Sequence, residues 1–277
     1  TGGALLLHRL LSTYPSPRLR VVELEPWTST PNQRLSGVTY DQIPFGVDRL
    51  VHSRLSPWYS AWLHEKAPYQ AVKVKEQISD FQPEAVLTVA HWHAYRTAAA
   101  VAEQNDLPLH LIVHDDMREV HPIWEPLKSR LTETLGETYK QAERRLCVSP
   151  YMAEAFEEEW SVKGDVLYPH RGPDSFTYNA PPHEADFKES PTTIGYAGST
   201  SASGAKRFIE IIEASENPDF KFLIFSPLSP ELADERGIRH PQIEYRSLIP
   251  PSEVVPTLRR EADILFDHSH QGNERVT

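Results

Sequence analysis

Short apolar runs alternate with longer stretches of helical periodicity along the chain. In the first part, the apolar runs predict strands that are covered on both faces, namely Arg20–Leu24, Ala85–Val89, Leu109–Val113, Leu146–Val148 and Val166–Tyr168. Helical patterns lie around them, namely Ala4–Leu11, Pro68–Phe81, Tyr95–Gln104, Glu125–Arg144 and a stretch opened by Ser149 as N-cap and Pro150. This alternation predicts parallel sheets with crossover helices, an α/β fold.

The pattern stops and then restarts. Residues 171–192 are rich in proline and acidic residues, which is typical of a linker or an ordered loop between domains. Beyond them we expect further strands and helices, namely strands at Thr193–Ala197, Lys221–Phe225, Ile243–Tyr245 and Asp263–Phe266, and helices at Ser203–Ala214 and Ser252–Glu261. The chain is therefore predicted to hold two α/β domains, residues 1–172 and 173–277.

Composition narrows the classes of function. Lys and Arg number 28 against 39 Asp and Glu, a net charge of −11, which argues against nucleic acid as the main partner. Cys147 is the only cysteine, so no intramolecular disulfide can form, and we expect a reducing compartment such as the cytoplasm. No apolar run approaches the roughly 18 residues of a membrane span.

The strongest local motif is a small-residue loop between a predicted strand and a predicted helix. It runs from Ile194 through Gly198, Ser199 and Thr200 to Lys206. Backbone N–H groups, hydroxyls and a lysine at a helix start suit a diphosphate, although an ordinary strand–helix turn has the same composition. Gly2 and Gly3 precede another helix and offer a second such start, or simply a flexible chain end.

Histidines and acids follow two of the predicted strands. His91 and His93 end one, and His114, Asp115 and Asp116 end another. In a doubly wound sheet, ligands bind beyond the carboxyl ends of the strands, so these side chains could share one cleft. A metal site, hydrogen bonding to a polyol substrate, and simple capping of the strands all remain open.

The order of the motifs resembles that of the retaining GT-B glycosyltransferases of the glycogen-synthase and mannosyltransferase group. The resemblance covers nearly the whole chain and rests on Gly2-Gly3, Val89–His93, Ile112–Asp115, Val148–Met152, Leu167–Asp174, Ile194–Lys206, Gln242–Ile249 and Ala262–Ile264. Ser199 stands where that family usually has an arginine. The family's first strand and its late acidic E-x7-E element are not found, so we expect a chain shortened at both ends.

The resemblance implies two Rossmann-like domains of the GT-B class, with doubly wound parallel sheets facing across a cleft. It implies sugar transfer from a nucleotide diphosphate sugar to a glycan or lipid-linked acceptor, as in polysaccharide biosynthesis, with retention of configuration and no metal or other cofactor. His114 is the expected catalytic residue, orienting the sugar. Donor binding is expected of Gly2, Gly3, Gly198, Ser199, Thr200, Lys206 and Ile249, and acceptor-side roles of His91, His93 and Asp115.

Two other classes of function remain open. One is a non-catalytic sugar- or nucleotide-binding protein, such as a partner subunit of the same fold. The other is a metal-dependent hydrolase that uses His91, His93, His114 and Asp116. Peripheral membrane contact is compatible with the sequence, and the oligomeric state, the sugar and the nucleotide are not specified by it.

Overall fold

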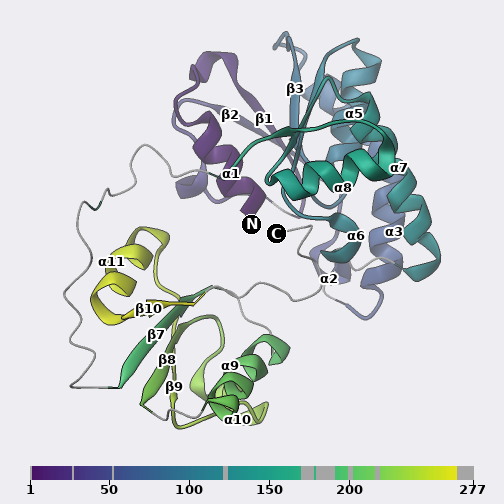
Figure 1. Cartoon of the computed structure of the whole chain (residues 1–277). Coiled ribbons are helices and arrows are strands. Elements are labelled where there is room, and N and C mark those ends of the chain that lie inside the picture. The colour runs from purple at the N-terminus through teal and green to yellow at the C-terminus, as the bar shows by residue number, and fades with distance from the viewer. Residues whose placement is uncertain are drawn as a thin grey trace. The chain divides into compact units, whose positions relative to one another are not determined.

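The computed structural model describes residues 2–26, 28–51, 53–120, 124–169, 178, 191–198, 202–215 and 219–266 (Figure 1). The described residues form two compact units, one up to residue 169 and the other from residue 178. The predicted domain boundary at residues 172–173 lies outside the described residues. Both units are α/β with parallel sheets, as predicted.

The first unit contains two parallel sheets. β1 pairs with β2, and β3, β4, β5 and β6 pair in that order. Its elements run in the order α1 Gly2–Leu11, β1 Arg20–Leu24, β2 Thr39–Ile43, α2 Asp48–Val51, α3 Ser56–Lys66, α4 Ala71–Gln77, β3 Val86–Val89, α5 Ala94–Gln104, β4 Leu109–Val113, α6 Met117–Val120, α7 Lys128–Gln141, β5 Arg144–Cys147, α8 Pro150–Trp160 and β6 Asp165–Val166.

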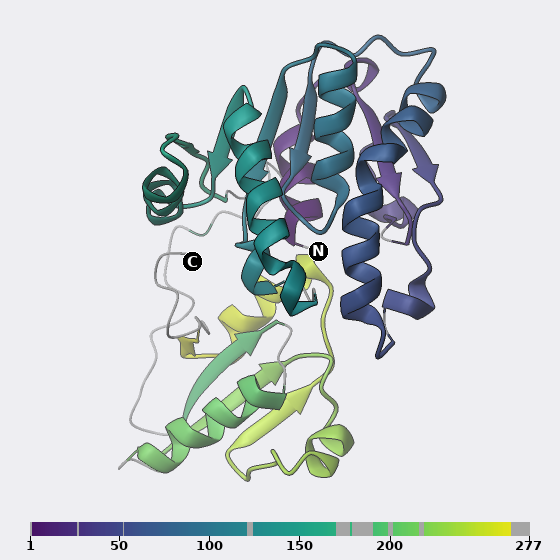
Figure 2. The ribbon, with the colours of Figure 1, turned by 90° about the vertical axis from the view of Figure 1, so that its right-hand side faces the viewer.

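Helices cover both faces of the four-stranded sheet (Figure 2). On one face, Leu6 of α1 packs against Val89 and Ile112. On the other face, Leu111 and Val113 of β4 pack under α5, α7 and α8. Successive residues of β4 thus serve opposite layers, which explains its unbroken apolar run and confirms the doubly wound arrangement.

The second unit has one four-stranded parallel sheet in the order β10-β7-β8-β9. Its elements are β7 Thr192–Ala197, α9 Ala202–Ala214, β8 Phe220–Phe225, α10 Pro230–Glu235, β9 Ile243–Arg246, α11 Pro251–Glu261 and β10 Ile264–Leu265. Phe208 of α9 packs against Phe222 of β8 at a ring-centroid distance of 5.0 Å. On the opposite face α11 and the residue after it approach so closely that a Cβ on Gly195 would lie 2.9 Å from the Leu258 Cδ2 and 2.6 Å from the Ala262 Cβ.

Five of the described strands and α-helices have no counterpart in the sequence-based prediction: β2, α3 and α10, and the short helices α2 and α6. The sequence of β2 is interrupted by Asp41, which is buried because it forms an ion pair with Arg20 of β1. The aromatic residues of α3 break its periodicity, since Trp58 and Trp62 are about half exposed. The expected N-cap is confirmed: the Ser149 Oγ accepts a hydrogen bond from the Met152 N–H at 3.1 Å.

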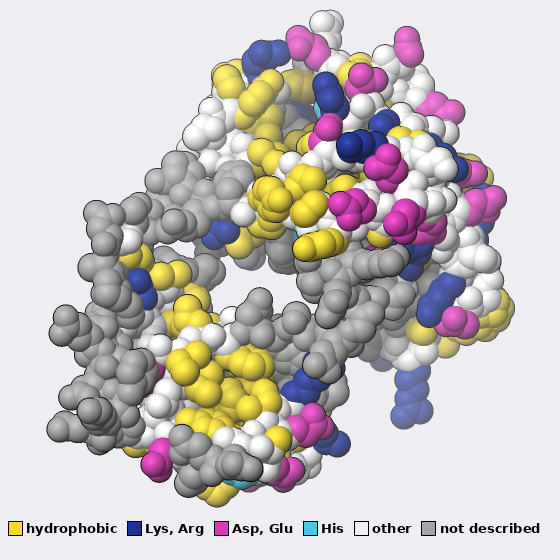
Figure 3. Space-filling model, in the orientation of Figure 1, with side chains coloured by type: hydrophobic (Ala, Val, Ile, Leu, Met, Phe, Trp, Pro, Cys, Tyr) yellow, Lys and Arg dark blue, Asp and Glu magenta, His cyan; other side chains and the backbone are white. Residues whose placement is uncertain are grey.

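In the part of the chain that the structure describes, none of the helices has both the length and the apolar character needed to span a bilayer. Acidic and basic side chains are interspersed over the described surface of the first unit that Figure 3 shows. That distribution agrees with the acidic composition.

Candidate functional site

The candidate site lies at the carboxyl edge of β3 and β4 in the first unit. The two strands are parallel neighbours, with Val89 opposite Ile112. The Ala90 N–H extends the pairing by donating to the Ile112 carbonyl at 2.7 Å. The residues that follow the two strands therefore meet at one edge of the sheet, where ligands bind in doubly wound folds.

His91, His114 and Asp115 come together at this edge. One possible ligand atom from each lies within 4.8 Å of the others. The two imidazole rings are 5.5 Å apart between centroids and almost perpendicular. The His114 Nε2 is 3.2 Å from an Asp115 carboxylate oxygen, and Asp115 is the more exposed of the two side chains. Three of the residues that the sequence singled out therefore form one polar cluster.

Both imidazoles of the cluster are held toward their neutral form. Burial lowers the pKa of His91, and the nearby His114 lowers that pKa further. Burial also lowers the pKa of His114, while the Asp115 carboxylate acts in the opposite direction. A neutral imidazole carries one N–H donor and one acceptor nitrogen, a combination that suits sugar hydroxyls as well as metal ions.

Gly3 brings the first turn of α1 against this cluster. A Cβ at that position would lie 3.1 Å from the Val89 Cγ1 and 3.4 Å from the His114 Nε2. The first distance is tighter than ordinary packing and the second is an ordinary contact, so a side chain at this position would press on Val89 and touch the imidazole. Gly3, expected to bind the donor, thus lies beside His114, the expected catalytic residue, and Gly2 is the first residue of the same helix. Their roles stay predictions.

His93 and Asp116 have other surroundings. β3 ends at Val89, and Trp92 adopts a positive φ of 51°, so the chain turns between His91 and His93 and does not bring both to the same place. His93 is 1% exposed, and its ring contacts Phe45 edge-on. An acceptor-side role for His93 has no exposed atom to act through.

Asp116 belongs to a buried ion-pair network that sequence reasoning did not identify. Its carboxylate accepts hydrogen bonds from the Arg118 side chain, the shortest at 2.6 Å, and Arg118 also reaches Glu159 of α8 at 2.6 Å. The hydrogen bond with Asp116 is the main reason why the Arg118 pKa is raised. The network ties the segment after β4 to α8 and so fixes the residues beside His114 and Asp115.

The donor-binding residues predicted for the second unit follow its strands. Gly198 comes directly after β7, and its N–H donates to the Phe225 carbonyl at 3.0 Å. Lys206 is exposed on α9, and Ile249 is half-buried between β9 and α11. Ser199 and Thr200 lie outside the described residues. β7 and α9 thus flank the predicted phosphate-binding segment on either side, and phosphate binding there stays a prediction.

Solved structures share the fold at low identity. The Arabidopsis thaliana protein UGT89C1 in complex with quercetin is 13% identical, with a TM-score of 0.55 over 96% of this chain and 71% of that one. The catalytic domain of Arabidopsis thaliana starch synthase IV, bound to ADP and acarbose, is 11% identical, with a TM-score of 0.52 over 83% of this chain and 61% of that one. The lipopolysaccharide outer core galactosyltransferase WaaB is 14% identical, with a TM-score of 0.49 over 83% of this chain. The chain spans only 58% of WaaB.

A comparison with curated proteins found no match. The model of Glycosyltransferase Family 4 matches residues 21–172, which is more than half of the chain and includes β3, β4 and the polar cluster at their carboxyl ends. This match agrees with the GT-B fold of the solved structures and with the order of the motifs. The chain therefore belongs to Glycosyltransferase Family 4.

Proposed function

We propose that the protein transfers a sugar from a nucleoside diphosphate sugar to the hydroxyl of an acceptor. The observation that carries the proposal is the meeting of Gly3, His91, His114 and Asp115 at the carboxyl edge of β3 and β4, in a chain of Glycosyltransferase Family 4. The bond between the anomeric carbon and the phosphate oxygen breaks, and a bond to the acceptor oxygen forms. The acceptor proton passes to the departing diphosphate.

His114 orients the sugar in this proposal. Its lowered pKa keeps the imidazole neutral near pH 7, so it can exchange hydrogen bonds with sugar hydroxyls without adding positive charge where the anomeric carbon becomes electron-poor. We do not assign it the role of a general base. His91 and Asp115 are proposed to hold acceptor or sugar hydroxyls beside it, and His93 is left out because it is buried.

Donor binding is assigned mainly to the second unit. The leaving nucleoside diphosphate gains negative charge as the glycosidic bond breaks. Backbone N–H groups around Gly198, the hydroxyls of Ser199 and Thr200, and the ammonium of Lys206 are of the type that stabilises such charge. Ile249 is proposed to contact the nucleotide base, and Gly2 and Gly3 add the amide groups of the α1 start.

Finer features of the proposal rest on the resemblance in motif order. They are retention of configuration, transfer of a hexose without a metal ion, and a glycan or lipid-linked acceptor of the kind used in polysaccharide biosynthesis. Work in the cytoplasm is proposed from the single cysteine, Cys147, and peripheral contact with a membrane is compatible with the sequence. Each of these features can be tested separately from the proposed transfer of a sugar from a nucleoside diphosphate sugar. Product stereochemistry by NMR distinguishes retention from inversion, and activity in the presence of a chelator tests the need for a metal.

A thermal-shift panel of nucleotide sugars tests the central assignment. We expect one nucleoside diphosphate and its sugar to raise the melting temperature, because a ligand at 100 times its Kd stabilises by about 2.7 kcal/mol. The matching free sugar, added alone, serves as the control and should have little effect. If UDP, ADP and GDP sugars all leave the melting temperature unchanged at millimolar concentration, the assignment is wrong.

Metal-dependent hydrolysis is the second candidate, and the cluster of His91, His114 and Asp115 favours it. Two imidazoles and one carboxylate are a common ligand set for a catalytic zinc ion, which would activate a water molecule. The ligand set expected from the sequence, His91, His93, His114 and Asp116, is corrected at two positions. His93 is buried against Phe45, and Asp116 is ion-paired with Arg118. Metal analysis of the purified protein decides between the candidates, and sugar transfer that survives chelation rules out hydrolysis by a bound metal.

A further inference from the structure

Aromatic side chains gather on the exposed face of α3 in the first unit. Trp58 and Trp62 lie one turn apart on this helix, so they share a face, and they are 54% and 50% exposed. The opposite face of α3 is seated in the protein, where Leu63 is fully buried and the His64 Nε2 lies 2.9 Å from the Thr134 hydroxyl oxygen of α7. Contiguous apolar patches on an open surface mark binding sites.

Two stacked pairs of rings make up this surface. The rings of Trp58 and Trp124 are 3.6 Å apart between centroids and inclined by 24°. The rings of Tyr59 and Trp62 are 5.6 Å apart and inclined by 12°. We call these four residues the aromatic platform. Trp58 is half exposed although one face of its ring lies against Trp124, so its other face is open to a ligand.

Hydrogen bonds from neighbouring segments hold the platform together. The Tyr59 hydroxyl oxygen accepts a hydrogen bond from the Val47 N–H at 2.8 Å. The Trp124 N–H donates to the Pro57 carbonyl at 3.2 Å, which ties the segment after α6 to the start of α3. Because the rings are already ordered, a ligand that stacks on them costs little additional side-chain entropy.

The platform lies at one end of the first unit together with the start of α1. α3 follows β2 by way of α2, and Trp124 follows β4 by way of α6. Figure 1 shows α2 and α6 at the same end of the first unit as the start of α1, where Gly3 lies beside His114. Ligands of doubly wound folds bind at the carboxyl ends of the strands. The platform therefore shares an end of the first unit with the polar cluster of the candidate site.

The charges beside the platform argue against an anionic lipid surface as its occupant. Binding to such a surface requires cations that are free to meet lipid phosphates. Close to Trp124, the Lys128 ammonium is 2.9 Å from the Glu125 carboxylate, and the Arg130 guanidinium is 2.7 Å from the Glu133 carboxylate. These bases are paired with acids, and the net charge of −11 also opposes contact with an anionic surface.

Aromatic rings with polar groups at their edges fit sugars. The C–H groups on one face of a pyranose ring carry partial positive charge, and the face of an aromatic ring carries partial negative charge. Indole N–H groups are donors for sugar hydroxyls, and the carboxylates of Glu65 and Glu125, whose side chains are 45% and 78% exposed, are acceptors. A neutral glycan offers both the apolar ring faces and the hydroxyls that this surface matches.

We propose that the aromatic platform binds the sugar rings of a neutral glycan chain by stacking. The bound chain is the acceptor, and the platform holds sugar rings that lie away from the reacting hydroxyl. Naming the glycan as the acceptor rests on the proposed function, whereas glycan binding itself does not. A chain of several sugars engages both stacked pairs, so its affinity exceeds that of a monosaccharide.

Native electrophoresis in gels that contain a soluble polysaccharide tests the proposal. The full chain is run with soluble starch, a mannan, a galactomannan or a mixed-linkage β-glucan, and its retardation gives an apparent Kd. Trp62→Leu keeps an apolar side chain but removes the ring, whereas Trp62→Phe keeps a ring. Tyr14→Leu changes a 44% exposed aromatic residue beyond the end of α1 and is the matched control. Vesicles of phosphatidylcholine and phosphatidylglycerol form a separate arm.

We expect at least one of these polysaccharides to retard the wild type, with glucose or mannose alone binding much more weakly. Trp62→Leu should raise the apparent Kd about fivefold because a stacking ring is lost. Trp62→Phe and Tyr14→Leu should stay within about twofold of the wild type. Vesicles should bind neither the wild type nor the variants.

The proposal is overturned if none of the polysaccharides retards the wild type, or if Trp62→Leu is retarded as strongly as the wild type. Vesicle binding that persists in Trp62→Leu, without retardation by any polysaccharide, would show an apolar contact with a membrane instead. The thermal shift with nucleotide sugars, measured on the same wild-type protein, reports the proposed function separately. A donor shift without glycan binding contradicts the platform alone, and glycan binding without a donor shift contradicts sugar transfer alone.

Discussion

The two units share one architecture but differ in the continuity of their sheets. In the second unit, β7 has a neighbour on each side, and α9 packs with the strands in one core that includes Phe208, Phe222 and Ile224. In the first unit, the apolar residues divide into three cores, around β4, around β1 and β2, and around α1. Two of these cores lie on the opposite faces of the four-stranded sheet, and the third belongs to the separate sheet of β1 and β2, beside which a cavity of about 180 Å³ lies.

The units also differ in the groups that they offer for chemistry. The first presents the side chains of His91, His114 and Asp115, and burial lowers the pKa of the two histidines. The second presents a strand end at Gly198 and an exposed lysine. Side-chain clusters of this kind depend on how two distant segments are packed together, while backbone amides depend only on a local turn. Four predictions test this comparison.

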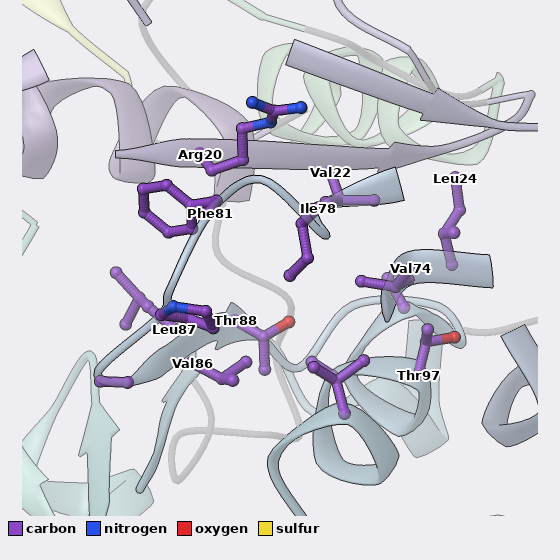
Figure 4. Close-up of a pocket in the computed structure, with 15 residues that line it drawn as sticks. Arg20, Val22, Leu24, Val74, Ile78, Phe81, Val86, Leu87, Thr88 and Thr97 are labelled. Carbon is purple, nitrogen blue, oxygen red and sulfur yellow. The ribbon is translucent and has the colours of Figure 1, made fainter. Parts of the chain in front are cut away.

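The largest effect is expected from the continuous sheet. Ile224 is fully buried in the middle of β8, and we expect Ile224→Ala to lower the free energy of unfolding of the second unit by about 3 to 4 kcal/mol. The Leu87→Ala change in β3 removes a similar number of atoms. Leu87 is only half-buried and lines a cavity of about 180 Å³ between β1 and β3 (Figure 4), so this change should cost only about 1 kcal/mol. Hydrogen exchange in urea reports each unit separately. Equal losses would mean that the surroundings of Leu87 are packed as tightly as the continuous sheet.

The division of chemistry predicts different kinetic effects in the two units. We expect His114→Ala to lower turnover about 100-fold, which corresponds to about 2.7 kcal/mol, with nucleotide affinity nearly unchanged. Lys206→Ala should raise the Kd of the nucleoside diphosphate about tenfold, or about 1.4 kcal/mol, because one cation is lost. Lys140→Ala, on α7 of the first unit, is the charge-matched control. Calorimetry and initial rates measure both effects.

Each of these two measurements can contradict the proposed division of chemistry between the two units. Unchanged turnover in His114→Ala would reduce this histidine to a structural residue. Nucleotide affinity that is the same in the wild type and in Lys206→Ala would remove the lysine from the donor site and leave the sequence of strand, loop and helix as an ordinary crossover.

The ion-pair network should contribute more than an exposed pair. Asp116 is buried, so Asp116→Asn leaves the Arg118 guanidinium with a neutral partner and should cost about 2 kcal/mol of stability. Glu159 is more exposed, and Glu159→Gln should cost about 0.5 kcal/mol. Urea denaturation followed by tryptophan fluorescence measures both. If the two variants lose equal stability, burial is not what distinguishes the two carboxylates.

The smallest effect concerns pH. His91 and His114 have folded-state pKa values below the ordinary 6.5, so the unfolded chain binds protons more readily. Their neutral forms therefore contribute stability that is complete above about pH 6.5 and is lost as the pH falls below it. Each histidine can contribute a slope of at most about 1.4 kcal/mol per pH unit.

The melting temperature should accordingly fall between pH 7.5 and pH 5.5, and the fall should be smaller in the double variant His91→Asn/His114→Asn. His240→Asn, in the second unit outside the cluster, is the control. An unchanged slope in the double variant would show that other groups govern the acid sensitivity.

Much of the fold could be predicted from the sequence because buried parallel strands are nearly continuous apolar runs. The predicted bounds of β1 and β4 match those in the structure, and α5 differs by one residue. β2 was missed because a buried Asp41 is acceptable only next to Arg20, a partner 21 residues away. α3 was missed because its aromatic side chains do not follow a buried stripe.

The residues of the candidate site also fall into those that the sequence could place and those that it could not. The sequence could place His91 and His114 after parallel strands, and the topology then brings such residues to one edge. It could not separate His93 from His91, because the positive φ at Trp92 turns the chain after β3 has ended. The sequence also could not show that Asp116 is ion-paired. Arg118 is only two residues away, but the orientation of both side chains is fixed by Glu159 on α8, which is distant in sequence.

The sequence alone is enough to assign the α/β class, most of the strands and the polar residues at their ends, because periodicity and strand-end position are local properties of the chain. Only the folded structure shows which of those polar residues meet, which are buried in the interior and that the strands of the first unit divide between two sheets. Burial, ion pairing and strand pairing depend on segments far apart in sequence, and a local pattern carries no information about the partner that will satisfy it.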